Sequence, residues 1–272
     1  METNLQPFTL EKMSVIHNNP VEYFLDLPED KKISLNQFLG KKIHLKHTGL
    51  IFCLHCEKKT KKSFNQGYCY PCFIKLAQCD LCIMKPETCH FSQGTCREPE
   101  WAESHCNIDH IVYLANSSGL KVGITRKTQI PVRWIDQGAT SAIPLFQVKS
   151  RFFSGLLEVA IKKYVTDRTQ WQKMLKGEEE IIDLKLEREK IFSLVEVEAK
   201  KLDAIFLKDE QVRTFQYPVL EYPTKVKSFS LEKEPTVSGV LRGIKGQYLI
   251  FDSGVINLRK YGGYQMILSE EK

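Results

Sequence analysis

Paired cysteines constrain this chain more than any other feature of its sequence. All nine cysteines lie between Cys53 and Cys106, and residues 53–72 read CLHCEKKTKKSFNQGYCYPC. This stretch holds two Cys-x-x-Cys pairs, Cys53/Cys56 and Cys69/Cys72. A two-residue gap lets both thiolates of a pair reach one tetrahedral ion, and two pairs supply the four sulfurs of a closed zinc site. Gly67, just before the second pair, suits the turn that such a site needs.

A second cysteine group follows as CDLCIMKPETCHFSQGTCREPEWAESHC. We expect Cys79, Cys82, Cys89 and Cys96 to bind a second zinc ion, with Cys106 as the main rival ligand. His90 and His105 lie close by and leave the assignment open. Each site can fill four positions with protein ligands, which leaves none for an activated water. Both ions are therefore predicted to be structural, in a segment too small to bury its own core.

Net charge and hydropathy limit the partners and the cell compartment that we expect for this chain. The 272 residues carry a formal net charge of +6, which suits a polyanionic partner and equally an ordinary lysine-rich protein. The first residues lack a basic start followed by an apolar block, and no run approaches the roughly 18–20 apolar residues of a membrane span. We expect a cytoplasmic protein without a membrane partner. Cytosolic thiols stay reduced, which favours metal over disulfides. The sequence contains no phosphate-binding glycine loop, so we expect no nucleotide cofactor.

Basic residues gather in two places that suit nucleic acid. One set lies on the loop between the first two cysteine pairs, near Phe64, Tyr68 and Tyr70, and the other lies close to the C-terminus among further tyrosines. The predicted nucleic-acid-binding residues are Lys58, Lys59, Lys61, Lys62, Arg259 and Lys260. Lysines bind phosphates and aromatic rings stack on bases. The alternative is that both sets are merely solvated.

The pattern changes after Cys106. Residues 110–115 form an apolar strand, 116–119 a polar turn and 120–125 a second strand. Tyr113 lies on the first strand and Lys121 begins the triplet Lys-Val-Gly on the second. Arg133 follows in IPVRWIDQGA. Residues 154–165 show helical spacing, with Ser154 as the expected N-cap and Glu158 in the first turn.

This order of elements resembles the GIY-YIG superfamily over about residues 108–175. The resemblance implies that Tyr113 positions or activates the attacking water and that Arg133 stabilises charge on the phosphate. It also implies that Glu158 holds one divalent ion, Mg²⁺ or Mn²⁺. Lys121 stands where the motif has its second tyrosine. A lysine there could act as a base only if burial or nearby cations lowered its pKa sharply, and otherwise it binds phosphate. His110 is an alternative base or zinc ligand.

The whole chain is also similar to a bacterial family of uncharacterised proteins that joins a zinc cluster to such a core. The stretches QGYCYPC, CREPEW, KVGIT and RWIDQGA carry this resemblance. It implies an architecture more than an activity.

The remaining sequence predicts one helical region and two β-rich ends. Residues 171–209 read as helical with a break at Gly177, and glycine-rich turns separate strands near 237–243, 247–251, 255–258 and 264–268. Short strands also occur in residues 5–52, so the two ends are expected to form a small antiparallel barrel or a shared sheet. The predicted class is α+β: a GIY-YIG-like α/β core preceded by a zinc-ribbon segment. The predicted segments are 1–52, 53–107, 108–176, 177–211 and 212–272.

Three functions fit these features. The first is a metal-dependent endonuclease that uses Tyr113, Lys121, Arg133 and Glu158 on DNA or RNA. The second is a non-catalytic nucleic-acid-binding module that uses the same groove. The third is a zinc-stabilised adaptor between proteins.

Overall fold

The computed structural model describes residues 3–271 and divides into two compact units. The first unit comprises residues up to 73, 175–177 and the chain from 216 onward, and the second comprises 74–174 and 178–215. Several antiparallel sheets and helices make up a mixed α+β structure, as the sequence predicted. The predicted segment boundaries at 52, 107, 176 and 211 stay a prediction. Met1, Glu2 and Lys272, the outermost residues of the first and last segments, lie outside the described residues.

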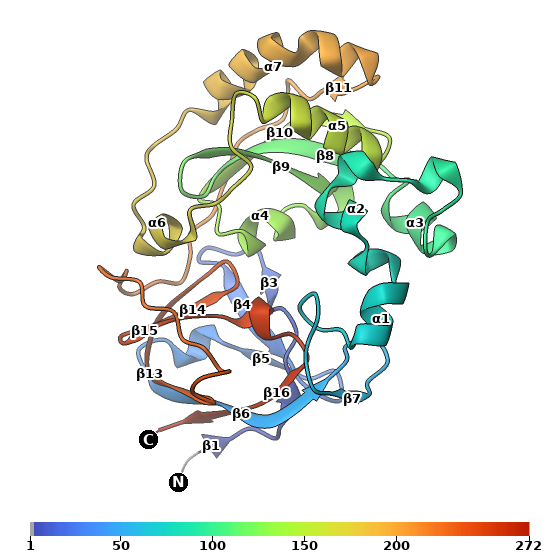
Figure 1. The fold of residues 1–272 in the computed structure, drawn as a ribbon. Helices are drawn as coiled ribbons and strands as arrows, with labels where there is room; N and C mark the ends of the chain where they lie inside the picture. Colours follow the sequence, from blue (N-terminus) through green and yellow to red (C-terminus); the bar gives the residue numbers. More distant parts are fainter. Residues whose placement is uncertain (1–2, 272) are drawn as a thin grey trace. The chain divides into compact units, whose positions relative to one another are not determined.

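An eight-stranded antiparallel sheet joins the two ends of the chain in the first unit (Figure 1). The strand order is β1-β16-β6-β13-β14-β15, with β2 added to β16 and β7 to β6. Leu45 of β6 pairs with both Val237 of β13 and Leu268 of β16. Within residues 3–271 the end strands β1 and β15 do not pair with each other, so the ends form the sheet and not the barrel. The strands are β1 (Thr3–Asn4), β2 (Phe8–Thr9), β6 (Lys42–Phe52), β7 (Lys59–Thr60), β13 (Thr236–Lys245), β14 (Tyr248–Phe251), β15 (Gly254–Asn257) and β16 (Tyr264–Glu270).

A smaller sheet completes the first unit. It runs in the order β3-β4-β5, and Asn36 after it binds back to the backbone of Val21 and Tyr23. Buried and partly buried residues alternate along β4, because successive side chains of a strand point to opposite faces. The remaining elements of this unit are β3 (Ser14–Ile16), β4 (Glu22–Asp26), β5 (Lys32–Ser34), η1 (Asn36–Phe38) and η6 (Leu258–Tyr261). Helix α1 (Tyr70–Lys75) lies where the chain passes from the first unit to the second.

The second unit is built on a five-stranded antiparallel sheet, ordered β11-β10-β8-β9 with β12 added to β10. Val112, Leu114 and Val122 share one apolar cluster with α5 and α7, which lie over that face in Figure 1. Tyr113 projects to the opposite face and meets Trp134 of α4, with ring centroids 5.6 Å apart. The strands are β8 (His110–Asn116), β9 (Leu120–Arg126), β10 (Ser141–Val148), β11 (Ile205–Phe206) and β12 (Arg213–Thr214). The helices after β8 are η5 (Lys127–Gln129), α4 (Val132–Asp136), α5 (Arg151–Ile161), α6 (Trp171–Lys176) and α7 (Leu184–Lys201).

Helix α5 begins earlier than the sequence pattern suggested. Its N-cap is Ser150, whose side chain accepts from the backbone N–H of Phe153 at 3.4 Å. Ser154 is buried inside the helix and donates to the carbonyl of Arg151. A serine inside a helix can bond to the preceding turn, so its presence alone does not mark a helix start. Glu158 therefore lies in the third turn and not in the first.

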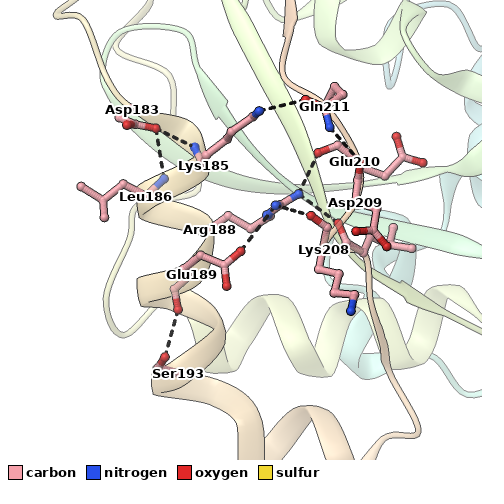
Figure 2. Close-up of polar contacts among 11 residues, drawn as sticks. Asp183, Lys185, Leu186, Arg188, Glu189, Ser193, Lys208, Asp209, Glu210 and Gln211 are labelled. Carbon is pink, nitrogen blue, oxygen red and sulfur yellow. Dashed lines mark hydrogen bonds and ion pairs between the residues drawn. The ribbon is translucent and has the colours of Figure 1, made fainter.

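The predicted helical region is interrupted around Gly177. Gly177 has a φ of +68°, which ends α6, and α7 starts only at Leu184, where Asp183 caps it. Arg188 of α7 is 5% exposed and donates to the carbonyls of the loop after β11 (Figure 2). Its contacts are Leu207 O at 3.0 Å, Glu210 O at 2.8 Å and Lys208 O at 2.5 Å. None of the helices in residues 3–271 combines the length and the apolar character needed to cross a bilayer.

The second cysteine group forms short helices that pack on α5. Gly155 lies directly against η3, because a Cβ there would come 2.5 Å from the backbone nitrogen of Glu87 and 2.8 Å from the Pro86 side chain. The elements are η2 (Ala77–Cys79), α2 (Leu81–Met84), η3 (Pro86–Thr88), η4 (Phe91–Gln93) and α3 (Pro99–His105). The cysteine segment thus supports the helix that carries Glu158.

This contact can be tested with Gly155→Ala. The added methyl group meets backbone atoms that cannot rotate away, so we expect a loss of about 1–3 kcal/mol in the free energy of unfolding. Urea unfolding followed by circular dichroism measures it. Val159→Ala, at an exposed position of the same helix, is the control and should change stability little. An unchanged midpoint for Gly155→Ala would show that η3 does not press on α5.

Candidate metal centre and polar cluster

The first four cysteines come together as predicted. Their sulfur atoms all lie within 4.8 Å of one another, and Cys56 Sγ is 3.7 Å from Cys69 Sγ. All nine cysteines are free thiols. A set of four thiol sulfurs at this spacing matches the donors of a structural zinc site. Cys53, Cys56, Cys69 and Cys72 can therefore hold a zinc ion.

Local backbone geometry shapes this centre. Cys53 follows β6 directly, and its turn closes through Glu57 N–H to Cys53 O at 2.8 Å. Burial raises the pKa of Cys53, but backbone N–H groups of Cys56, Cys69 and His55 lower it to about 6 overall. Gly67 has a φ of +149°, and a Cβ there would collide with Leu54. The predicted glycine turn before the second pair is present.

The loop between these pairs meets the C-terminal part of the first unit. Arg259 Nε donates to Gln66 Oε1 at 2.8 Å, and Ser63 Oγ donates to Gly262 O at 2.7 Å. Lys62 Nζ lies 5.2 Å from the centre of the Phe64 ring. The two basic sets predicted from distant parts of the sequence therefore adjoin each other beside the zinc centre. Lys58, Lys59, Lys61 and Lys62 are exposed.

The second cysteine group is arranged differently from the first. Cys82, Cys89 and Cys96 line one small cavity together with Cys106, whereas Cys79 does not line it. The one compact set of possible ligand atoms in this region is Asp80, Cys82 and His90, within 4.8 Å of one another. His105 stacks on Trp101. A second zinc ion bound by Cys79, Cys82, Cys89 and Cys96 therefore stays a prediction.

A polar cluster around the buried side chains of Tyr113 and Lys121 lies on one face of the second unit's sheet. Tyr113 of β8 pairs with Gly123 of β9, and Lys121 lies two residues before Gly123 on the same face. A Cβ at residue 123 would be 2.6 Å from the Tyr113 hydroxyl oxygen, so only glycine admits the tyrosine ring here. Tyr113 OH and Lys121 Nζ both donate to Gln137 Oε1, at 3.0 and 2.8 Å.

Arg133 and Glu158 lie within electrostatic range of this pair. Burial raises the pKa of Tyr113 to about 12. The charge of Arg133 and its hydrogen bond to Tyr113 oppose this rise, whereas the charge of Glu158 adds to it. Burial and then the Arg133 charge lower the pKa of Lys121 to about 8. The structure therefore brings all four predicted residues into one region and meets the condition that a basic role for Lys121 requires.

Two carboxylates, Glu158 and Asp167, lie close to this polar cluster. Burial raises the pKa of Glu158; the Lys162 charge opposes this and the Asp167 charge adds to it. Lys162 Nζ lies 2.8 Å from Asp167 Oδ2 and 3.7 Å from Glu158 Oε2. Asp167 was missed by sequence reasoning because it follows α5 in an irregular segment. Gln137 was missed too, although it stands four residues after Arg133, which is one helical turn away.

His110 does not have the surroundings of a base at neutral pH. It is fully buried, its Nδ1 donates to the carbonyl of Ile108 at 2.8 Å, and burial lowers its pKa to about 4. Its Nε2 is buried and has no hydrogen-bond partner in the part of the chain that the structure describes. It is not among the compact sets of possible metal ligands in residues 3–271.

The low pKa of Lys121 has a consequence for stability. Between about pH 8 and 10.5 the unfolded chain keeps a proton that the folded chain has lost, so wild-type stability rises with pH in this window. The rise in the free energy of unfolding is on the order of 3 kcal/mol, and Lys121→Met should remove it. Urea unfolding at several pH values measures the difference. Lys127→Met, at an exposed lysine nearby, should keep the wild-type slope; equal slopes in all three proteins would contradict the shift.

Loss of zinc from the first centre can be tested with Cys56→Ser. We expect this variant to bind one zinc ion fewer than wild type and to unfold at lower urea, because metal binding contributes directly to folding. Metal analysis after gel filtration measures the zinc content. Ser63→Ala, on the same loop, is the control and should retain its zinc. Full zinc content in Cys56→Ser would contradict the four-cysteine centre.

Comparison with known proteins gives one match. No curated protein and no solved structure matches the chain. A family model described as "Protein of unknown function (DUF2797)" matches residues 40–266, which include both cysteine groups and the polar cluster. The chain belongs to the DUF2797 family.

Proposed function

We propose that the protein is a zinc-stabilised endonuclease whose second unit is a GIY-YIG-like core that hydrolyses phosphodiesters of DNA or RNA with Mg²⁺ or Mn²⁺. The observation that carries the proposal is the shared hydrogen bonding of Tyr113 and Lys121 to Gln137, within range of Arg133 and Glu158. The order of β8, β9, α4, β10 and α5 supports it, since each predicted residue lies on its expected kind of element.

Lys121 is the proposed general base. With a pKa of about 8, about a tenth of its amines are uncharged at pH 7 and can take a proton from the attacking water. Tyr113 stays protonated at this pH, so its hydroxyl donates a hydrogen bond and fixes Gln137. Gln137 in turn holds the Lys121 amine in place. As water adds to phosphorus and the bond to the leaving oxygen breaks, Arg133 stabilises the growing negative charge.

Glu158 and Asp167 have donors that fit a divalent cation. Their carboxylate oxygens are the hard ligands that Mg²⁺ and Mn²⁺ prefer, and a cationic group, Lys162, already lies between them. Lys162 is partly exposed, so its ammonium can move away when another cation binds. A bound divalent ion would supply neutralisation of the phosphate and of the leaving oxygen.

The basic surface of the first unit supports a nucleic-acid substrate. Lys61 and Lys62 are exposed on the zinc loop, and Arg259 is held against that loop through Gln66. Phosphate contacts by such side chains release counterions, which makes binding weaken steeply with salt.

A second function, non-catalytic nucleic-acid binding, is favoured by one contact. Lys162 pairs with both carboxylates and so neutralises Glu158 without a metal ion. If Lys162 keeps both ion pairs when nucleic acid binds, no divalent ion binds at Glu158. The second unit then binds a nucleic-acid strand without cleaving it.

Cleavage assays with Glu158→Gln and Arg133→Ala test the nuclease. The zinc-loaded protein is incubated with mixed RNA and DNA, with Mg²⁺, with Mn²⁺ and with neither. We expect wild type to cleave only when Mg²⁺ or Mn²⁺ is added. The cleavage rate should fall at least about 100-fold in each variant, because each substitution removes a group that stabilises the transition state. Glu103→Gln is the control. Glu103 is exposed and is not one of the proposed catalytic residues, so this variant should cleave at the wild-type rate.

Binding measured on the same nucleic acids separates the remaining functions. Salt-sensitive binding without cleavage would replace the nuclease by the binding module. Neither binding nor cleavage would reject both and leave an adaptor between proteins.

A further inference from the structure

The irregular chain between α5 and α6 passes beside an end strand of the second unit's sheet (Figure 1). That strand is β9. The carbonyl oxygen of Thr166 accepts from the backbone N–H of Val122 at 2.9 Å, and Thr166 forms a parallel bridge with Lys121. Residues 166–170 therefore lie next to β9 at the position of its buried lysine.

The same segment covers the amine of Lys121. Thr169 Oγ1 accepts from Lys121 Nζ at 3.2 Å, and Lys121 is only 4% exposed. Thr169 is itself partly exposed, so it separates the amine from solvent on this side. A general base must come within hydrogen-bond distance of the proton that it takes. A substrate therefore reaches this amine only if part of the surrounding chain moves.

The two ends of the segment are anchored in the packed interior. Val165 belongs to the apolar cluster that α5 and α7 share with the sheet. Met174 is buried and lies against Gly138, where an added Cβ would come 2.6 Å from the Met174 sulfur. Between these anchors, residues 166, 168 and 170 are exposed. A segment with fixed ends and an exposed middle can open locally while the core stays folded.

Weak polar contacts hold the middle of the segment in place. Besides the bonds of Thr166 and Thr169, the backbone N–H of Gln170 donates to Ser118 Oγ at 2.9 Å. Asp167 Oδ2 lies 2.8 Å from Lys162 Nζ, but these side chains are 36% and 34% exposed, so solvent weakens the ion pair. Opening the segment thus breaks a few partly solvated contacts and leaves the sheet intact.

We propose that residues 166–170 form a lid, held closed by the hydrogen bond between Thr169 and Lys121, which opens to let a nucleic-acid strand reach the Lys121 amine. Its role in catalysis rests on the proposed nuclease, because it requires Lys121 as the base; the opening itself does not. The lid also carries Asp167, so its closure returns that carboxylate to Lys162 beside Glu158. The amine and the two carboxylates come together only when the lid is closed.

Acetylation of lysines by N-hydroxysuccinimidyl acetate at pH 8 tests the lid. With a pKa of about 8, about half of the Lys121 amines are uncharged at this pH, so an open Lys121 reacts readily. We expect Lys121 to react at least about 10-fold more slowly than the exposed Lys127 in wild type, because only the open state reacts. Peptide mass spectrometry measures the rate at each lysine.

Thr169→Val should raise the rate at Lys121 at least about 5-fold, because it removes the bond that closes the lid. Loss of this acceptor also disfavours the charged amine, but that effect can at most about double the uncharged fraction. A larger increase therefore reports access. Thr128→Val, the same substitution at an exposed residue of η5, is the control and should leave the rate at Lys121 unchanged.

Three results of the labelling experiment would overturn the proposal. Lys121 that reacts as fast as Lys127 in wild type would show that nothing covers the amine. Equal rates in wild type and Thr169→Val would show that Thr169 does not hold the segment closed. The same increase in Thr128→Val would show a general loosening of the unit.

Hydrogen exchange of wild type covers the case in which Thr169→Val does not fold. The amide of Val122 donates to Thr166 O, so its exchange reports directly on the lid. We expect its exchange rate to be insensitive to low urea, because a local opening exposes little surface. Exchange only through urea-dependent global unfolding would reject the lid. Neither measurement involves cleavage, so a lid that opens in a protein without nuclease activity would reject the nuclease and leave the lid standing.

Discussion

The close approach of Tyr113 to Gly123 is the contact on which the polar cluster depends. Because residue 123 has no side chain, the tyrosine ring lies over the neighbouring strand and its hydroxyl reaches Gln137. Gln137 accepts from the buried amine of Lys121, which also donates to Thr169 Oγ1 at 3.2 Å. Burying a lysine beside an arginine costs free energy, and this cluster contains both. Such an arrangement is typical of sites where charge is used and not merely tolerated.

The cysteine segment has a related structural role. Its short helices have little core of their own, and η3 lies so close to α5 that only glycine fits at residue 155. The order of the chain thus places this cysteine-rich support directly before the strand that carries Tyr113. Both features belong to the same unit, because residues 79–106 and the polar cluster lie within it.

Much of this could be predicted from the sequence, for identifiable reasons. The two Cys-x-x-Cys pairs predict the four-cysteine cluster almost regardless of their surroundings, because the spacing within each pair is local. The strands around Tyr113 and Lys121 follow from apolar runs separated by a polar turn. Ser154 led to a wrong start for α5, because the sequence alone does not distinguish a serine inside a helix from an N-cap serine. The pairing of β6 with β13 and β16, the meeting of Arg259 with Gln66, and the place of Asp167 beside Glu158 depend on long-range packing, which no local pattern encodes.

The shared sheet of the first unit has a consequence for how the protein is made. Strand β6 needs β13 and β16 as neighbours, yet about 190 residues separate β6 from β13 along the chain. During synthesis from the N-terminus, the second unit can emerge whole and fold while β6 still lacks both partners. Until β13 and β16 have been made, the unpaired strand is open to pairing with other chains. The cysteine loop that follows β6 is made earlier and pairs with that strand through β7, so an ion bound there would help to cover the end of the strand.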